Sequence, residues 1–114
     1  MKYSDAGIYQ RPQNTGRLLT HNEICDAIRR VADDYALTKV EYFGSYADGR
    51  ANEESDLDLL VEFAERSVSL LRIIGLQQSL EEIFNIPVDV IHAPIPKDSF
   101  LEVNNTVVAY ENQR

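Results

Sequence analysis

Cysteine and long apolar runs are scarce in this chain. Cys25 is the only cysteine in 114 residues, so no internal disulfide can form, which fits a reducing compartment. No apolar run approaches the roughly 18 residues that a membrane-spanning helix needs. Residues 1–10 lack the apolar stretch of a secretory signal. We therefore expect a cytoplasmic protein that makes no contact with a membrane.

Positive charge is also in the minority. The chain has 11 Lys and Arg against 19 Asp and Glu, which gives a formal net charge of −8. Phosphate backbones repel an acidic chain, so we expect no direct nucleic-acid binding. A nucleotide substrate would need cations to screen its charge, and an acidic surface suits a basic protein partner. With 44% hydrophobic residues, the chain can build the core of one ordinary domain.

The patterning predicts a flexible arm over residues 1–19 and a folded domain over residues 20–114. The arm holds turn formers and no sustained periodicity, whereas Thr20 and Glu23 match the capping box that opens a helix. Beyond them, apolar periodicity predicts the order helix, strand, strand, helix, strand, helix. The approximate ranges are 20–35, 39–43, 56–63, 67–84, 87–91 and 97–110. We expect an α/β or α+β class with a small mixed sheet flanked by helices.

Two carboxylates inside an apolar strand give the first sign of chemistry. Asp56 and Asp58 stand two residues apart, so they point to the same side of a strand. Two anions this close repel each other unless a metal ion or a proton intervenes. A solvated acidic face at an edge strand is the alternative, but the apolar residues 57–61 around Asp58 favour an interior strand.

Asp89 is a lone acid in the short apolar strand predicted over 87–91. A charge there is costly unless it has a partner, although an edge or capping aspartate remains an alternative. If the two strands are neighbours, the three carboxylates converge. Oxygen ligands without His or Cys suit a hard cation such as Mg²⁺. We therefore predict that Asp56, Asp58 and Asp89 bind the metal and carry the catalysis.

Gly44 and Ser45 end the first predicted strand, and we expect a short helix to open there. Glycine lets a phosphate approach the backbone, Ser45 can donate its hydroxyl and backbone N–H, and a helix N-terminus favours anions. Most such pairs are simple turns. Together with the three carboxylates, however, they predict phosphoryl chemistry, with a triphosphate at Gly44-Ser45 and Mg²⁺ on the carboxylates.

Residues 44–50, Gly-Ser-Tyr-Ala-Asp-Gly-Arg, and residues 55–61, Ser-Asp-Leu-Asp-Leu-Leu-Val, resemble the signature of the minimal nucleotidyltransferases. These belong to the DNA polymerase β-like superfamily, and Asp89 stands where that family has its third carboxylate. The resemblance implies a polymerase β-like nucleotidyltransferase fold, ATP as the substrate and Mg²⁺ as the metal. Many relatives have arginine at the position of Asp48, and Arg50 is the residue that would take over its phosphate contact.

The family is similar to the antitoxins of HEPN/MNT toxin–antitoxin modules, some of which transfer AMP from ATP to a tyrosine of the HEPN ribonuclease toxin. The leading hypothesis is therefore Mg²⁺-dependent transfer of AMP to a protein hydroxyl, with a HEPN toxin as partner. A second hypothesis, favoured by Asp48 and the net charge, is a binding module that neutralises a basic toxin with little or no catalysis. A third is a small-molecule nucleotidyltransferase that works with a second subunit.

Overall fold

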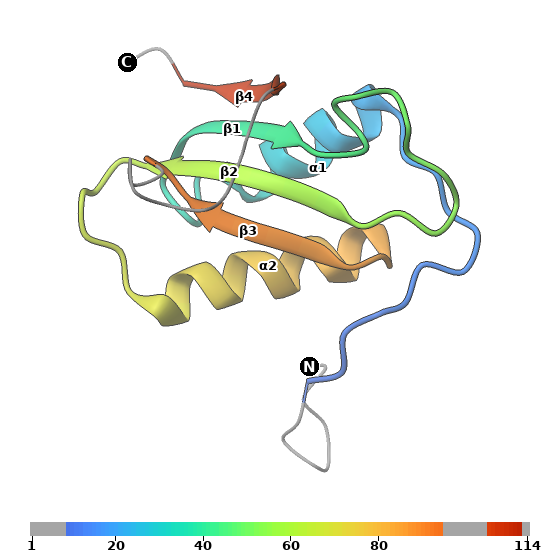
Figure 1. Ribbon diagram of the computed structural model, residues 1–114. Coiled ribbons are helices and arrows are strands. Elements are labelled where there is room, and N and C mark those ends of the chain that lie inside the picture. Colours follow the sequence, from blue (N-terminus) through green and yellow to red (C-terminus); the bar gives the residue numbers. More distant parts are fainter. Residues whose placement is uncertain (1–8, 95–104, 113–114) are drawn as a thin grey trace.

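The computed structural model describes residues 9–94 and 105–112, which form a four-stranded sheet and two helices (Figure 1). The elements are α1 His21–Ala32, β1 Leu37–Phe43, β2 Leu57–Phe63, α2 Leu70–Phe84, β3 Val88–His92 and β4 Val107–Glu111. The strand order is β3-β2-β1-β4. β1 is antiparallel to both β2 and β4, whereas β2 and β3 are parallel. The predicted class, a small mixed sheet flanked by helices, is confirmed.

Capping side chains set where the helices begin. The Thr20 hydroxyl accepts from the backbone N–H of Glu23 at 3.1 Å, and the Glu23 carboxylate accepts from the N–H of Thr20 at 2.9 Å, which completes the predicted capping box. α2 begins later than predicted because Ser69 caps it, accepting from the N–H of Arg72. Within the described ranges, no helix has the length and apolar character needed to cross a membrane.

The alternation of side chains in β2 separates the core from the open face of the sheet. Leu57, Leu59 and Val61 are each 0% exposed, whereas Asp58 and Leu60 between them are partly exposed. α1 and α2 contact each other, and they contact the strands at opposite edges of the sheet, β4 and β3. The helices and the leucine side of β2 share one hydrophobic core. Asp58 therefore points away from that core.

The predicted C-terminal helix is wrong where it can be checked. Val107–Glu111 forms β4, which pairs with β1. Residues 105 and 106 have no regular secondary structure, and residues 97–104 lie outside the described residues. The apolar spacing allowed a helix, but Val107 and Val108 are β-branched and β1 offers a free edge to pair with. Strand pairing therefore won over helical periodicity.

The short helix predicted to open at Ser45 is not present either. Residues 44–49 form hydrogen-bonded turns. The N–H of Asp48 donates to the carbonyl of Gly44 at 3.0 Å, and the N–H of Arg50 donates to the carbonyl of Ser45 at 2.9 Å. Gly44 and Gly49 have φ values of +71° and +73°, which turn the chain at both ends of this segment. An anion at Ser45 would meet a turn rather than a helix N-terminus.

Candidate active site

Two of the candidate carboxylates lie side by side on neighbouring strands. Asp58 of β2 is the in-register partner of Asp89 of β3, and the two strands are parallel. In-register residues of adjacent parallel strands project to the same face of a sheet. That face is the one opposite to Leu57 and Leu59, which are buried in the core. The fold therefore places two anions together on the open face of the sheet.

The electrostatics connect Asp56 to this pair. Partial burial, followed by the charges of Asp89 and Asp56 and a hydrogen bond with Asp89, raises the pKa of Asp58 to about 6. Asp56 itself is exposed and lies just before β2 begins. Within residues 9–94 and 105–112, no three acidic, His or Cys side chains are arranged to hold a metal ion as they stand. The metal-binding and catalytic roles of the three aspartates stay predictions.

Gly44 lets the end of β1 come close to Asp58. A Cβ atom at Gly44 would lie 2.6 Å from Oδ2 of Asp58, and φ there is +71°. The neighbouring Phe43 is the register partner of Asp58 across the β1–β2 pair. The Gly44-Ser45 turn thus adjoins the carboxylates, as the phosphate-binding hypothesis requires, while the contacts of Gly44 and Ser45 with a nucleotide stay a prediction.

Arg50 forms an ion pair with Asp48. Asp48 stands at the position where an arginine was expected, and Arg50 was predicted to take over the phosphate contact of that arginine. Nη2 of Arg50 donates to Oδ2 of Asp48 at 2.7 Å, and the second oxygen of Asp48 accepts from Nδ2 of Asn105 at 3.0 Å. The hydrogen bonds from Arg50 and Asn105 hold the pKa of Asp48 below its usual value. Asp48 therefore ties the turn after β1 to the residues before β4, and the predicted phosphate contact of Arg50 stays a prediction.

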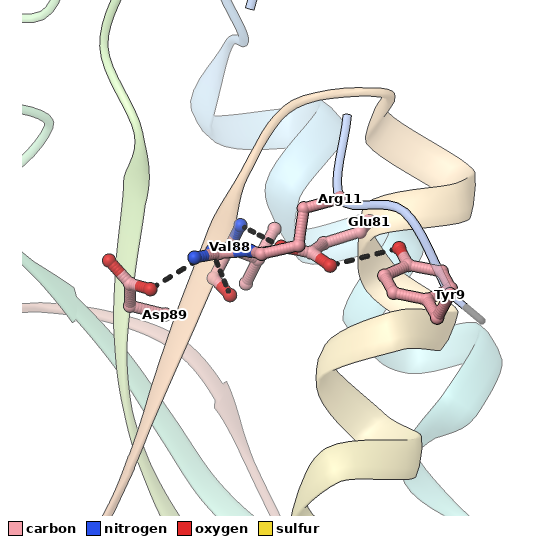
Figure 2. Close-up of polar contacts among 5 residues, drawn as sticks. All are labelled: Tyr9, Arg11, Glu81, Val88 and Asp89. Atoms are coloured by element: carbon pink, nitrogen blue, oxygen red, sulfur yellow. Dashed lines mark hydrogen bonds and ion pairs between the residues drawn. The ribbon is translucent and has the colours of Figure 1, made fainter. Parts of the chain in front are cut away.

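A second arginine reaches the site from the N-terminal segment. Nη2 of Arg11 donates to Oδ1 of Asp89 at 3.0 Å, and its Nε donates to Oε2 of Glu81 at 2.8 Å (Figure 2). The pKa of Arg11 is raised: burial alone would lower it, but its hydrogen bonds with, and the charges of, Glu81 and Asp89 outweigh that effect. Arg11 is therefore a cationic partner of Asp89. Among the ion pairs of the described residues, Asp58 has no such partner.

Other residues of the same segment support the loop that leads to Asp56. Nδ2 of Asn14 donates to the carbonyl of Ser55 at 2.9 Å, and the N–H of Gly16 donates to the carbonyl of Glu53 at 3.1 Å. Between residues 14–16 and 52–54 lies an open hollow of about 600 Å³. Residues 14–16 thus contact the loop that leads to Asp56. The flexible arm predicted over residues 1–19 stays a prediction, and residues 1–8 lie outside the described residues.

Arg11 and Glu81 were not among the site residues predicted from the sequence. Arg11 stands among turn formers, so no periodicity marks it. Glu81 could have been found from the sequence, because it lies on the buried side of α2 with Leu80 and Phe84, which are both 1% exposed. An acid on a buried helical stripe needs a partner, and Glu81 is itself only 1% exposed. As with Asp89, an acid among apolar residues marks Glu81 in the sequence, whereas nothing there marks the arginine that pairs with it.

Comparison with known proteins identifies a family and relatives of this chain. The family described as "Nucleotidyltransferase domain" matches residues 24–111. A Methanocaldococcus jannaschii protein named "Putative protein adenylyltransferase" is 39% identical over 80 residues, which cover 67% of this chain and 92% of that protein. A Thermococcus cleftensis protein named protein adenylyltransferase MntA is 36% identical over 63 residues, 55% of this chain and 63% of its own length.

Solved structures show the same fold. A "putative minimal nucleotidyltransferase" superposes with a TM-score of 0.56 at 32% identity, covering 68% of this chain and 81% of its own. A chain of a toxin–antitoxin complex with AMP-PNP superposes with a TM-score of 0.59 over 83% of this chain and 76% of its own. A chain of the complex between a tri-AMPylated Shewanella oneidensis HEPN toxin and its MNT antitoxin has a TM-score of 0.58, covering 82% of this chain and 74% of its own. The last two are 21% and 17% identical and therefore show the fold alone.

Proposed function

We propose that this chain, which belongs to the nucleotidyltransferase domain family, transfers AMP from ATP to a hydroxyl group of a HEPN-type toxin in a Mg²⁺-dependent reaction. The observation that carries the proposal is the in-register pair of Asp58 and Asp89 on the open face of the sheet. It lies beside a glycine turn that a side chain would obstruct. This arrangement places two carboxylates next to the Gly44-Ser45 turn, where the triphosphate would lie.

The donor set fits Mg²⁺. Carboxylate oxygens are the ligands this ion takes from proteins, and one or two of them commonly suffice beside substrate phosphates. Asp58 and Asp89 would hold the ion, with Asp56 as the third ligand. Burial, followed by the charges of Asp89 and Asp56, raises the pKa of Asp58, and the charge contribution supports this assignment because it marks carboxylates that repel one another. When bound, Mg²⁺ neutralises phosphate charge and aligns the attacking and leaving oxygens.

The protein groups have the roles of holding and orienting the nucleotide. The Ser45 hydroxyl and backbone N–H would donate to the triphosphate, which passes close to the backbone of Gly44. The carboxylates of Asp56, Asp58 and Asp89 make the site anionic, so ATP without a divalent cation meets repulsion there. ATP with Mg²⁺ should therefore bind much better than ATP alone.

The acceptor is proposed from the relatives and from charge. The M. jannaschii relative named as a protein adenylyltransferase is covered over 92% of its length. Structural neighbours include the complex of a tri-AMPylated HEPN toxin with an MNT antitoxin. A net charge of −8 favours a basic protein partner through long-range attraction.

A second candidate function is neutralisation of the toxin by binding alone. The observation that favours it is the Asp48–Arg50 pair at 2.7 Å, which engages the cation expected to contact phosphate. An acid at position 48 also adds repulsion for a triphosphate at the neighbouring turn. A chain of this kind would form the complex but transfer AMP slowly or not at all.

The two candidates are separated by intact-mass measurement of the partner. The purified chain is incubated with a HEPN-type protein encoded beside it, with ATP and Mg²⁺. A mass increase of the partner by one or more AMP units is expected, and EDTA should abolish it. A stable complex without any increase would support binding alone, whereas neither complex nor increase would contradict both candidates.

Two variants tie the transfer to the carboxylates. Asp58→Asn should lose most of the transfer, because it removes a proposed metal ligand. Glu62→Gln is the matched control: Glu62 lies on the same face of β2 but is exposed and away from Asp89. It should transfer AMP at the wild-type rate. Transfer by Asp58→Asn at that same rate would contradict the assignment of the site.

A further inference from the structure

Arg11, in the segment before α1, forms hydrogen bonds with Asp89 and with two neighbouring groups. Its Nη2 donates to Oδ1 of Asp89 at 3.0 Å and to the backbone carbonyl of Val88 at 3.2 Å, while its Nε donates to Oε2 of Glu81 at 2.8 Å (Figure 2). One guanidinium thus bridges a carboxylate on α2 and a candidate metal ligand on β3. Because the guanidinium is planar and its donors point in fixed directions, it restricts where Oδ1 of Asp89 can lie.

Glu81 provides a rigid base for this contact. Its side chain is 0% exposed. Besides Nε of Arg11, it accepts from the hydroxyl of Tyr9 at 2.9 Å and from the backbone N–H of Val88 at 2.9 Å. A buried carboxylate with three donors has little freedom to change rotamer, and the donor at Val88 ties it directly to β3. The position of Arg11 is therefore set by the packed body of the protein.

The positive charge of Arg11 does not cancel the negative charge of the three aspartates, because Glu81 lies next to the guanidinium. Glu81 lies 2.8 Å from the guanidinium, closer than Asp89 at 3.0 Å. The unit charges of Arg11 and Glu81 offset each other, so the three aspartates keep their combined negative charge for a divalent cation. Arg11 can therefore orient Asp89 through directed hydrogen bonds while Glu81 compensates its charge.

We propose that Arg11 is a positioning residue for the candidate metal site. Anchored on Glu81, it holds one oxygen of Asp89 and directs the other toward the cation that Asp58 and Asp89 would share. The inference rests on the proposed function, because the orientation of Asp89 matters to a cation only if the site binds one.

Titration of the full-length chain with Mn²⁺, followed by electron paramagnetic resonance of the free ion, tests this directly without any activity measurement. Arg11→Gln should weaken Mn²⁺ binding by about tenfold, the usual size of an effect on a residue that orients a metal ligand. This variant also makes the region more negative by one unit, which by itself would tighten cation binding. Weaker binding would therefore point to lost orientation and not to lost charge.

Three further variants separate positioning from stability and charge. Arg11→Lys keeps the charge but cannot bridge both carboxylates with a planar fork, so it should recover only part of the affinity. Arg17→Gln removes an equal charge from the same segment, where Arg17 pairs with Glu23 at 3.6 Å, and should bind Mn²⁺ like the wild type. Tyr9→Phe removes a donor from Glu81 without removing the contact to Asp89, so it should lower the melting temperature more than the affinity.

The outcomes separate the positioning role of Arg11 from the existence of the proposed metal site. With AMP transfer as a second readout, Arg11→Gln should raise the Mg²⁺ concentration for half-maximal activity and change the rate at saturating Mg²⁺ much less. Unchanged or tighter Mn²⁺ binding by a folded Arg11→Gln, or equal weakening by Tyr9→Phe, would overturn the positioning role alone. A wild-type chain that binds no Mn²⁺ would overturn the proposed metal site and this inference with it.

Discussion

Two arginine–aspartate pairs flank the candidate site, and they differ in what lies behind them. Arg50 and Asp48 are 2.7 Å apart, with the Arg50 side chain 71% exposed. Arg11 and Asp89 are 3.0 Å apart, but the same guanidinium also pairs with Glu81, which is 0% exposed. Exposed pairs contribute about 0–1 kcal/mol, whereas breaking a buried pair costs about 3–5 kcal/mol. Arg11 and Asp89 are themselves 43% and 46% exposed, so the difference lies in Glu81: removing Arg11 unpairs a buried carboxylate, whereas removing Arg50 unpairs only Asp48.

Removing Arg11 should have the largest effect on stability. Arg11→Ala leaves Glu81 buried without its cation, and we expect a loss of about 2–4 kcal/mol in the free energy of unfolding, less than for a fully buried pair because Arg11 is partly exposed. Urea denaturation monitored by circular dichroism measures it. Arg17→Ala is the control and should change stability by less than about 1 kcal/mol. Equal losses for the two variants would remove the distinction between buried and exposed pairs.

Asp58→Asn should stabilise the protein at neutral pH. The folded-state pKa of about 6 lies above the ordinary value of 3.8, so the folded chain binds this proton more tightly than the unfolded chain. Stability should therefore fall as the pH rises from about 4 to 6 and stay reduced above that range. Asp58→Asn removes the penalty, and we expect about 1–2 kcal/mol of added stability at pH 7, since solvent screens a half-buried carboxylate.

Urea denaturation of wild type and Asp58→Asn at a series of pH values between 4 and 7, in EDTA, tests the sign. The two curves should converge near pH 4 and separate as the pH rises. A variant that is less stable than wild type at pH 7 would contradict the penalty that burial and the charges of Asp89 and Asp56 impose on the ionised Asp58 carboxylate.

The two turn glycines offer the next smaller effect. Both Gly44→Ala and Gly49→Ala place a side chain at positive φ, which costs about 1–2 kcal/mol. At Gly44 the added Cβ would also meet Oδ2 of Asp58 at 2.6 Å, whereas at Gly49 nothing lies within 4 Å. Gly44→Ala should lose at least as much stability as Gly49→Ala by urea denaturation, because the Asp58 carboxylate must also move, and only Gly44→Ala should lower Mn²⁺ affinity. Equal Mn²⁺ affinities would separate the turn from the carboxylates.

The smallest expected change belongs to the exposed pair. Arg50→Ala should alter the free energy of unfolding by less than about 1 kcal/mol, because the Arg50 side chain is 71% exposed. If Arg50 contacts the triphosphate, the KM for ATP should nevertheless rise while the melting temperature stays constant. A loss of stability as large as that of Arg11→Ala would contradict the ranking of the two pairs.

Local signals in the sequence predicted the elements around the site well. Thr20 and Glu23 form the capping box that their spacing indicated. The apolar residues around Asp58 predicted an interior strand, and Leu57 and Leu59 of β2 are indeed 0% exposed. These features could be predicted because each depends on residues a few positions apart, and burial of the apolar side leaves the acids on the other.

Contacts between distant residues could not be predicted in this way. Arg11 and Asp89 are 78 positions apart, and nothing near Arg11 distinguishes it from other residues of a polar arm. The apolar spacing of residues 97–110 matched a helix, but pairing with β1 made Val107–Glu111 a strand. Strand pairing and ion pairing depend on which partner the fold brings near, so propensity alone does not decide them.

The sequence by itself determined the chemistry on offer: an acidic chain, a carboxylate at position 56 just before an apolar strand, carboxylates at positions 58 and 89 within apolar strands, and a glycine turn before them. The tertiary structure decided how these groups meet. Parallel pairing of β2 and β3 set Asp58 opposite Asp89, and the packing of the N-terminal segment against α2 gave Asp89 a cation while leaving Asp58 with raised proton affinity. The physical reason is that charge interactions depend on distance and burial, which only the folded chain sets.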